Sequence, residues 1–295
     1  MGVFNLIVNL FSFLYVLLWD GILVVGNLIL PERTPDQVVP KGHPGFGGKW
    51  PEYIAPKEGD SRCSCPGMNA MANHGILPRD GRNISFVDLT TAMQATYNFA
   101  PTYAFFLPNY AAIMMQKSYS KGTFDLVEMD KHNKIEHDAS LVREDAYFEP
   151  DQSKIATPVV EDLLARASGP NGELVAKDIA GALSQRIVDC RAGNPEFCTN
   201  VLDRLFGAGK MLMSVFGSAS MMLSLFGGSV PNLRALLLEE RFLDGWLPTD
   251  RSRYGVTLVA FNVTAMKVYM RMNWEHLQPS RLSKNQSQGT HVKSD

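Results

Sequence analysis

The chain has 295 residues, of which 45% are hydrophobic and 20% charged, and its formal net charge is −2. This length allows one substantial core, and we find no boundary that would divide the body into two domains. The near-neutral balance argues against nucleic acid as the main partner, because phosphate binding needs a clustered basic surface. Four cysteines are too few for a disulfide scaffold, and Cys190 and Cys198 either form a disulfide or remain two reduced, buried thiols.

The first thirty residues are strongly apolar, with no Lys, Arg or Glu between Val3 and Leu30. A bilayer span needs about 20 mostly apolar residues, and this segment is long enough. Its flanks lack the basic start and the small-residue cleavage site of a signal peptide. We therefore predict a membrane anchor over residues 1–30, with a removed signal and a buried soluble helix as the alternatives.

Asp20 interrupts this segment, and a carboxylate at the centre of a straight span is unfavourable in lipid. Two half-inserted helices that meet at Asp20-Gly21 would answer that objection. The basic residues that follow, from Arg33 onward, favour a cytosolic body, whereas glycosylation sequons such as that at Asn83 would matter only in the secretory lumen. We predict a single-pass or monotopic membrane protein of the endoplasmic reticulum or secretory pathway, with its side of the membrane left open.

Residues 31–62 are rich in Pro, Gly and charge, which predicts an extended linker that wraps around the body. Helical signals dominate beyond it. Ser85, followed three residues later by Asp88, approximates a capping box, and Pro101 stands where a first helical turn should begin.

The second half of the chain continues this pattern. Pro158 suits the start of a helix with Thr157 as its cap, and Gly-Pro-Asn-Gly at 169–172 separates two further helical stretches. We find no series of alternating strands bounded by hairpin turns. The fold class predicted is therefore all-α, with a single helical domain over residues 63–277 and a polar, disordered tail over residues 278–295.

The densest chemistry lies around Cys65. Pro66 suits the first position of a helix and Gly75 suits the left-handed residue just past its end, so Cys65 occupies the N-cap. Unpaired N–H groups and the positive end of the helix dipole are expected to lower the pKa of its thiol there. A thiolate of this kind is a strong axial donor to a haem iron. Cys63 has no assigned role, and the polar side chains of the helix are expected to tie it to neighbouring loops.

Taken alone, a Cys-Pro at a helix start is more often structural, but the surrounding residues carry a resemblance. Residues 64–86, SCPGMNAMANHGILPRDGRNISF, are similar to the proximal motif of the fungal haem-thiolate peroxidases, the family of chloroperoxidase and the unspecific peroxygenases. Residues 136–140, Glu-His-Asp-Ala-Ser, resemble a second motif of its shorter members. Residues 194–197 with the following FGAGKMLMSVFG, and residues 240–248, match in placement. The resemblance spans about Pro40 to Met272.

The resemblance implies a role for each matching residue. Cys65 is expected to ligate the iron of haem b. Glu136 and Ser140, with the backbone of His137 and a haem propionate, are expected to hold Mg²⁺ or Mn²⁺, which prefer oxygen donors. His137 is expected to be one member of the distal acid–base pair that moves a proton of hydrogen peroxide. The catalytic set implied is His137, Glu136 and Lys210.

Two positions depart from the family's pattern. Ser64 stands where the family has a proline, which leaves the approach to Cys65 less rigid. Lys210 stands where the family places its distal glutamate, and with an ordinary pKa of about 10.4 only about one lysine in 2,500 is neutral at pH 7. Burial could lower that pKa so that Lys210 acts as a base. Alternatively it stays charged as a donor, or points elsewhere and leaves His137 to act alone.

Three functions follow from these residues. The first is a membrane-associated peroxidase or peroxygenase that oxidises a hydrophobic small molecule with hydrogen peroxide, in secondary metabolism. The second is a redox-neutral biosynthetic enzyme that uses the same pocket through Lys210. The third is a haem protein that binds or senses a ligand without turnover, since a fold and cofactor do not fix a reaction. The Phe and Met residues of 201–227 either line a substrate channel or belong to the core.

Overall fold

The structure, a computed structural model, describes residues 3–132, 136–197 and 217–273, with side chains from residue 14 onward. The long helices are α1 (Val3–Ile29), α3 (Pro66–Asn73), α4 (Phe86–Tyr97), α5 (Pro101–Met114), α6 (Thr157–Ala165), α7 (Ala176–Gly193), α10 (Val230–Glu239) and α11 (Leu258–Tyr269). Shorter elements are α2 (Pro35–Val38) and the 3₁₀ turns η1 (Phe46–Gly48) and η2 (Leu126–Met129).

Sheet structure in the described residues is limited to one short pair, so the prediction of a mainly helical fold is confirmed. Strand β1 (Ile84–Ser85) runs antiparallel to β2 (Thr123–Phe124), with Ile84 opposite Phe124. Two isolated parallel bridges join Phe99 to Val256 and His132 to Glu136. The β1–β2 pair and the Phe99–Val256 bridge join segments far apart in the sequence, so they close the fold without forming a layer of their own.

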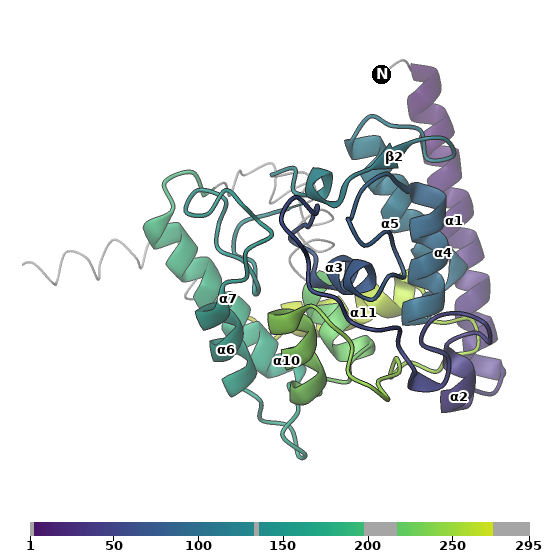
Figure 1. Ribbon diagram of the computed structural model, residues 1–295. Coiled ribbons are helices and arrows are strands. Elements are labelled where there is room, and N and C mark those ends of the chain that lie inside the picture. Colours follow the sequence, from purple (N-terminus) through teal and green to yellow (C-terminus); the bar gives the residue numbers. More distant parts are fainter. Residues whose placement is uncertain (1–2, 133–135, 198–216, 274–295) are drawn as a thin grey trace, which may run out of the picture.

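Helix α3 lies between two groups of helices (Figure 1). Helices α1, α4 and α5 lie on one side, and α6, α7 and α10 lie on the other. Helix α10 packs against both α3 and α6, and α11 packs against both α1 and α7. This arrangement places the short helix that begins after Cys65 in the middle of the body.

The helix boundaries follow from local signals that the sequence contains. Ser85 caps α4, with its hydroxyl accepting the N–H of Asp88 at 3.0 Å. Pro101 and Pro66 begin α5 and α3 as predicted. The predicted cap of α6 is wrong, because Thr157 is already helical and Ala156 occupies the cap without a side-chain hydrogen bond.

Helix α1 is continuous from Val3 to Ile29, so the alternative of two half-helices that meet at Asp20-Gly21 is wrong. Asp20 is fully buried (0% exposed), and its carboxylate accepts the N–H groups of Leu258 and Val259, each at 2.9 Å. It also accepts the hydroxyl of Thr102. The residue that looked unfavourable in lipid thus caps α11 and holds α1 against the start of α5.

In the part of the chain that the structure describes, no helix combines the length and the apolar character that crossing a bilayer requires. The C-terminal half of α1 is joined to the body a second time through Asn27. Its amide donates to the carbonyl of Gly255 at 2.9 Å and accepts the N–H of Tyr254 at 2.7 Å. Helix α1 therefore packs as part of the body over these residues.

Candidate active site

Cys65 occupies the N-cap of α3, as predicted, and Gly75 adopts the left-handed conformation (φ +69°) just past its end. The backbone N–H groups of Met68 and Gly67 act to lower the pKa of the thiol, although neither closes a cap hydrogen bond to the side chain. Tyr97 fixes this first turn from α4, because its hydroxyl donates to the carbonyl of Gly67 at 2.8 Å.

The prediction that the helix start lowers the pKa of Cys65 overall is wrong, because the pKa is raised. Burial raises the pKa of the Cys65 thiol and outweighs the opposing effect of the Met68 and Gly67 amides and of the Arg143 charge. Cys65 as a whole residue is only partly buried. The protein alone therefore keeps the thiol protonated, and a bound metal ion would supply the charge that removes the proton.

These features fit an axial ligand to haem iron. A thiol held at the start of a helix, where the backbone N–H groups of Gly67 and Met68 favour its charged form, has the donor chemistry that a haem-thiolate centre needs. The amide groups would continue to act on the sulfur after ligation, which is the usual role of groups outside the ligand set. Cys63, by contrast, is completely buried (0% exposed) and directs its sulfur toward the Asn69 side chain and the Cys65 carbonyl.

Asn69, on the first full turn of α3, holds the chain that leads to Cys65. Its Nδ2 donates to the carbonyl of Cys63 at 2.7 Å, and its Oδ1 accepts the N–H of Cys63 at 3.0 Å. Asn73 donates to the carbonyl of Glu240 at 3.1 Å. The expectation that polar residues of this helix tie it to neighbouring loops is confirmed.

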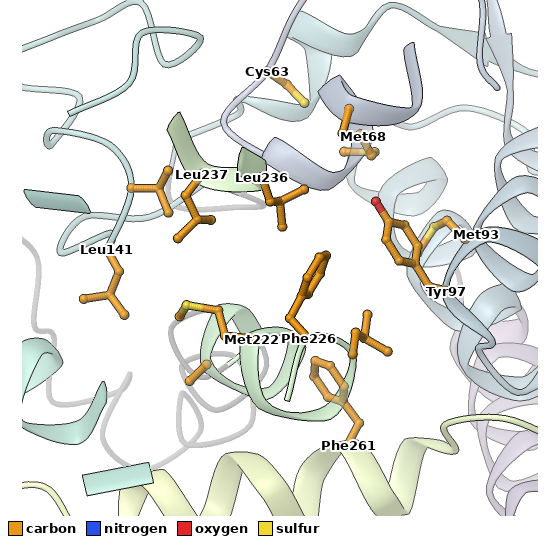
Figure 2. Close-up of a cluster of buried hydrophobic side chains, with 14 of the residues drawn as sticks. Cys63, Met68, Met93, Tyr97, Leu141, Met222, Phe226, Leu236, Leu237 and Phe261 are labelled. Atoms are coloured by element: carbon orange, nitrogen blue, oxygen red, sulfur yellow. The ribbon is translucent and has the colours of Figure 1, made fainter. Parts of the chain in front are cut away.

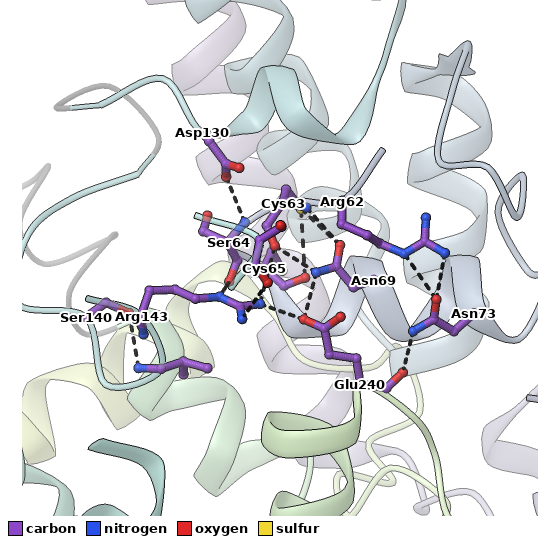
Figure 3. Close-up of polar contacts among 12 residues, drawn as sticks. Arg62, Cys63, Ser64, Cys65, Asn69, Asn73, Asp130, Ser140, Arg143 and Glu240 are labelled. Carbon is purple, nitrogen blue, oxygen red and sulfur yellow. Dashed lines mark hydrogen bonds and ion pairs between the residues drawn. The ribbon is translucent and has the colours of Figure 1, made fainter. Parts of the chain in front are cut away.

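Arg143 and Glu240 complete the polar cluster around this approach (Figure 3). The Arg143 guanidinium donates to the carbonyl of Ser64 at 3.1 Å, to that of Cys63 at 3.3 Å and to the Glu240 carboxylate at 2.6 Å. From the opposite side, the Asp130 carboxylate accepts the N–H of Ser64 at 2.7 Å. Arg143 and Asp130 have no predicted role from sequence, and Glu240 is predicted only as part of a matching segment.

A cluster of buried apolar side chains adjoins this polar set (Figure 2). Met222 and Phe226 point toward Leu236 and Leu237 of α10, and all four are 3% exposed. In the described part of the 201–227 segment, these residues therefore belong to the core. Lys210, in the remainder of that segment, and Cys198, just before it, lie outside the described residues. Cys190 is a free, buried thiol.

Glu136, His137 and Ser140 lie on one loop, as their spacing requires. Glu136 is buried, and its Oε2 bonds to Nδ1 of His132 at 2.6 Å, while Oε1 has no partner within the described residues. Ser140 Oγ accepts two backbone N–H groups, those of Val142 and Arg143, each at 3.2 Å. Among the described side chains, no group of three His, Cys, Asp or Glu could hold a metal ion. This loop thus offers one open carboxylate oxygen.

His137 has a defined orientation. Its Nδ1 lies 2.8 Å from the carbonyl oxygen of Asp138, and because a carbonyl only accepts, Nδ1 carries the hydrogen in this contact. In the neutral ring, Nε2 is then the nitrogen with a free lone pair. His137 can therefore take up and release a proton at Nε2 while its ring stays fixed.

Asp130 introduces a pH dependence at this site. Burial raises its pKa to about 6, against the lowering effect of the Ser64 N–H and the Arg143 charge. An aspartate in the unfolded chain titrates near 3.9, so between about pH 4 and pH 6 the folded state binds more protons than the unfolded state. The contribution of Asp130 to folding stability is therefore complete below that window and falls as pH rises through it.

We expect the thermal unfolding midpoint of Asp130→Asn to fall less than that of the wild type as the pH rises from about 4 to about 6. The amide keeps an acceptor oxygen for Ser64 and has no charge to bury. The measurement is the unfolding midpoint from pH 4 to pH 7, with the variant Asp36→Asn at an exposed position of α2 as the control. An Asp130→Asn variant with the wild-type slope would contradict this assignment.

Comparison with known proteins agrees with the geometry. Residues 51–251 match the family model of the peroxidases of family 2, which covers more than half of the chain. The chain belongs to this family, that of the fungal haem-thiolate peroxidases. It is 30% identical over 161 residues to the dothistromin biosynthesis peroxidase of Dothistroma septosporum, covering 49% of this chain and 38% of that protein.

Two further relatives show the same pattern. The chloroperoxidase of Leptoxyphium fumago is 33% identical over 115 residues, 35% of this chain and 30% of that protein. The aromatic peroxygenase of Coprinellus radians is 28% identical over 177 residues, 50% of this chain and 67% of that protein. The chain thus spans well under half the length of the first two of these relatives. Family membership implies haem as the cofactor.

Proposed function

We propose that this protein is a haem-thiolate peroxidase or peroxygenase that oxidises a hydrophobic small molecule with hydrogen peroxide, as part of secondary metabolism. The observation that carries the proposal is Cys65 at the N-cap of α3, in the segment that matches the family model. Bound haem would supply the oxidising chemistry, and thiolate donation favours O–O cleavage. Relatives named as peroxidases and peroxygenases support the reaction class.

The described residues have limited, definite tasks in this reaction. Cys65 would hold the iron of a bound haem, and the buried apolar side chains of Met222, Phe226, Leu236 and Leu237 would exclude water from that side of the site. His137 holds or releases a proton at Nε2, with the Asp138 carbonyl fixing the ring. Lys210 is proposed as a further acid or base on the evidence of its sequence position alone.

The test is the carbon monoxide difference spectrum of the reduced, haem-loaded protein, followed by turnover of aromatic and aliphatic substrates with and without peroxide. A thiolate-ligated haem absorbs well to the red of a histidine-ligated one. We expect that red-shifted band and product only with peroxide. A histidine-type spectrum would refute the proposed centre.

Lys210 favours a second candidate, a redox-neutral biosynthetic reaction in the same pocket. A lysine in place of the family's distal glutamate removes the carboxylate that would serve as base. Product formed without peroxide would support this candidate, and Lys210→Glu should then gain peroxide-dependent chemistry. A thiolate spectrum with no product under either condition would support the third possibility, a haem protein that senses or binds a ligand.

We also propose that Mg²⁺ or Mn²⁺ binds at Glu136. The support is the unpartnered Oε1 of this buried carboxylate, since a hard cation satisfies such an oxygen. Ser140 and the backbone of His137 would be the neighbouring donors, although Ser140 already accepts two N–H groups. Metal analysis of the purified holoprotein tests this, with Glu136→Gln expected to lose the bound ion.

Membrane association through α1 is a further part of the proposal, with the endoplasmic reticulum or secretory pathway as the compartment. From residue 14 onward, where its side chains are described, α1 has a series of apolar and aromatic side chains that are at least 40% exposed, namely Leu14, Tyr15, Leu17, Leu18, Ile22, Val25, Leu28 and Ile29. Since Asp20 and Asn27 hold the opposite face to the body, we propose that α1 lies along the membrane surface as a monotopic contact.

Flotation with phosphatidylcholine vesicles tests this contact. Leu18 and Ile22 are 72% and 69% exposed, so Leu18→Glu with Ile22→Glu should preserve the fold and release the protein from vesicles. Val87→Glu places a charge on an exposed apolar position of α4 and is the matched control. Equal flotation of both variants would argue against α1 as the contact.

A further inference from the structure

Arg143 is the largest side chain that the described residues bury completely, at 0% exposure. A guanidinium without solvent is strongly unfavourable unless its charge is paired and its N–H groups are bonded. Here they are bonded to three backbone carbonyls and one carboxylate. Two of those carbonyls belong to Cys63 and Ser64, the two residues directly before Cys65.

The contacts of Arg143 join three distant parts of the chain. Its own backbone N–H is held by Ser140 Oγ, and its Nη1 donates to the carbonyl of Ser153 at 3.1 Å. Its Nη2 reaches Glu240, at the end of α10, at 2.6 Å. The guanidinium thus connects the 136–145 loop, the end of α10 and the chain before α3 (Figure 3).

One oxygen of Glu240 serves two partners. Oε1 accepts from Arg143 at 2.6 Å and from Asn69 Nδ2 at 2.8 Å. Asn69 in turn bonds to both the N–H and the carbonyl of Cys63. Glu240 therefore orients both the Asn69 amide and the Arg143 guanidinium, which hold Cys63. Its own backbone has a left-handed conformation (φ +50°) at the end of α10.

We propose that Arg143, oriented by Glu240, is a positioning residue for Cys65, which holds the carbonyls of Cys63 and Ser64 so that the sulfur stays directed at the haem iron. This inference rests on the proposed function. Ser64 gives the approach to Cys65 more freedom than a proline would, and three hydrogen bonds to residues 63 and 64 restrict that freedom from outside.

Charge gives the pair a second effect. Arg143 and Glu240 carry opposite charges, pair at 2.6 Å and lie against the two residues that precede Cys65, so the two charges oppose one another close to the proposed ligand. Reduction potentials of haem centres depend on charge and hydrogen bonds around the axial ligand. Removing only the Glu240 charge leaves the positive charge unopposed and should raise the reduction potential of the iron.

The experiment uses the full-length haem-loaded protein and two conservative variants. Arg143→Lys keeps the charge but lacks the planar fork that reaches two carbonyls and a carboxylate. We expect a haem dissociation constant about 10-fold higher or more, with part of the reduced carbon monoxide complex shifted away from the thiolate position. Glu240→Gln keeps size and hydrogen bonding, and should retain the thiolate band with a higher reduction potential.

The matched control is Arg186→Lys. Arg186 donates to the carbonyls of Ser140 and Arg143 and pairs with Glu144 at 2.7 Å, so it holds the same loop without touching residues 63 or 64. We expect wild-type haem affinity, band position and potential from this variant, even if its unfolding midpoint falls. A purely structural role for Arg143 would make the two lysine variants behave alike.

The outcomes separate the inference from the proposed function. Wild-type protein without a thiolate band overturns both. A normal wild-type band with unchanged haem affinity, spectrum and potential in folded Arg143→Lys and Glu240→Gln overturns the positioning role alone. If Arg143→Lys fails to fold, the potential of Glu240→Gln decides, and a wild-type value overturns the inference.

Discussion

Replacing Cys65 by serine is expected to abolish the red-shifted carbon monoxide band and to lower the haem content of the purified protein. A serine hydroxyl stays protonated near neutral pH, and it cannot replace the electron donation of a thiolate. The amides of Gly67 and Met68 would remain at the start of α3, so the fold around the site should persist. The measurement pairs the difference spectrum with haem content per chain.

Cys63→Ser is the matched control, because Cys63 lies two residues away and is also a free thiol. Its ties to Asn69 at 2.7 and 3.0 Å run through backbone atoms, which serine retains. We expect the wild-type spectrum and haem content. If Cys63→Ser lost the band and Cys65→Ser kept it, Cys63 and not Cys65 would be the ligand of the iron.

The features that the sequence predicted correctly depend on interactions within a few residues. Ser85 caps α4 through an N–H three positions on, and Pro66 and Pro101 start helices because of their own fixed φ. The N-cap position of Cys65 belongs to the same class. Composition and motif order then indicated a helical fold and this family, and the observed helices and the family match agree with both.

The features that it missed join residues far apart in the chain. The partner of Arg143 is Glu240, 97 positions away, and no local pattern marks such a pair. The pKa of Cys65 shows the same limit, because its helix start was visible in sequence but the burial that raises the pKa is tertiary. Lys210 stays a prediction, because it lies outside the described residues.

Asp20→Ala is expected to destabilise the fold by about 3 kcal/mol. A lost helix cap is worth about 1 kcal/mol, and leaving buried N–H and hydroxyl groups without an acceptor costs about 1–3 kcal/mol more. The groups affected are the N–H groups of Leu258 and Val259 and the hydroxyl of Thr102. Asp20→Asn keeps one acceptor oxygen and should fall between wild type and Asp20→Ala.

The measurement is guanidinium unfolding of the full-length protein followed by circular dichroism, with Asp36→Ala on the exposed α2 as the control. Because Asp20 joins α1 to residues 82 and 238 positions away, its loss should lower the midpoint of the whole transition rather than release α1 alone. An unchanged midpoint would mean that α1 behaves as a separable anchor. A lowered midpoint would mean that the body of the protein depends on α1 for its stability. The helix that exposes the apolar face would then be an integral part of the fold.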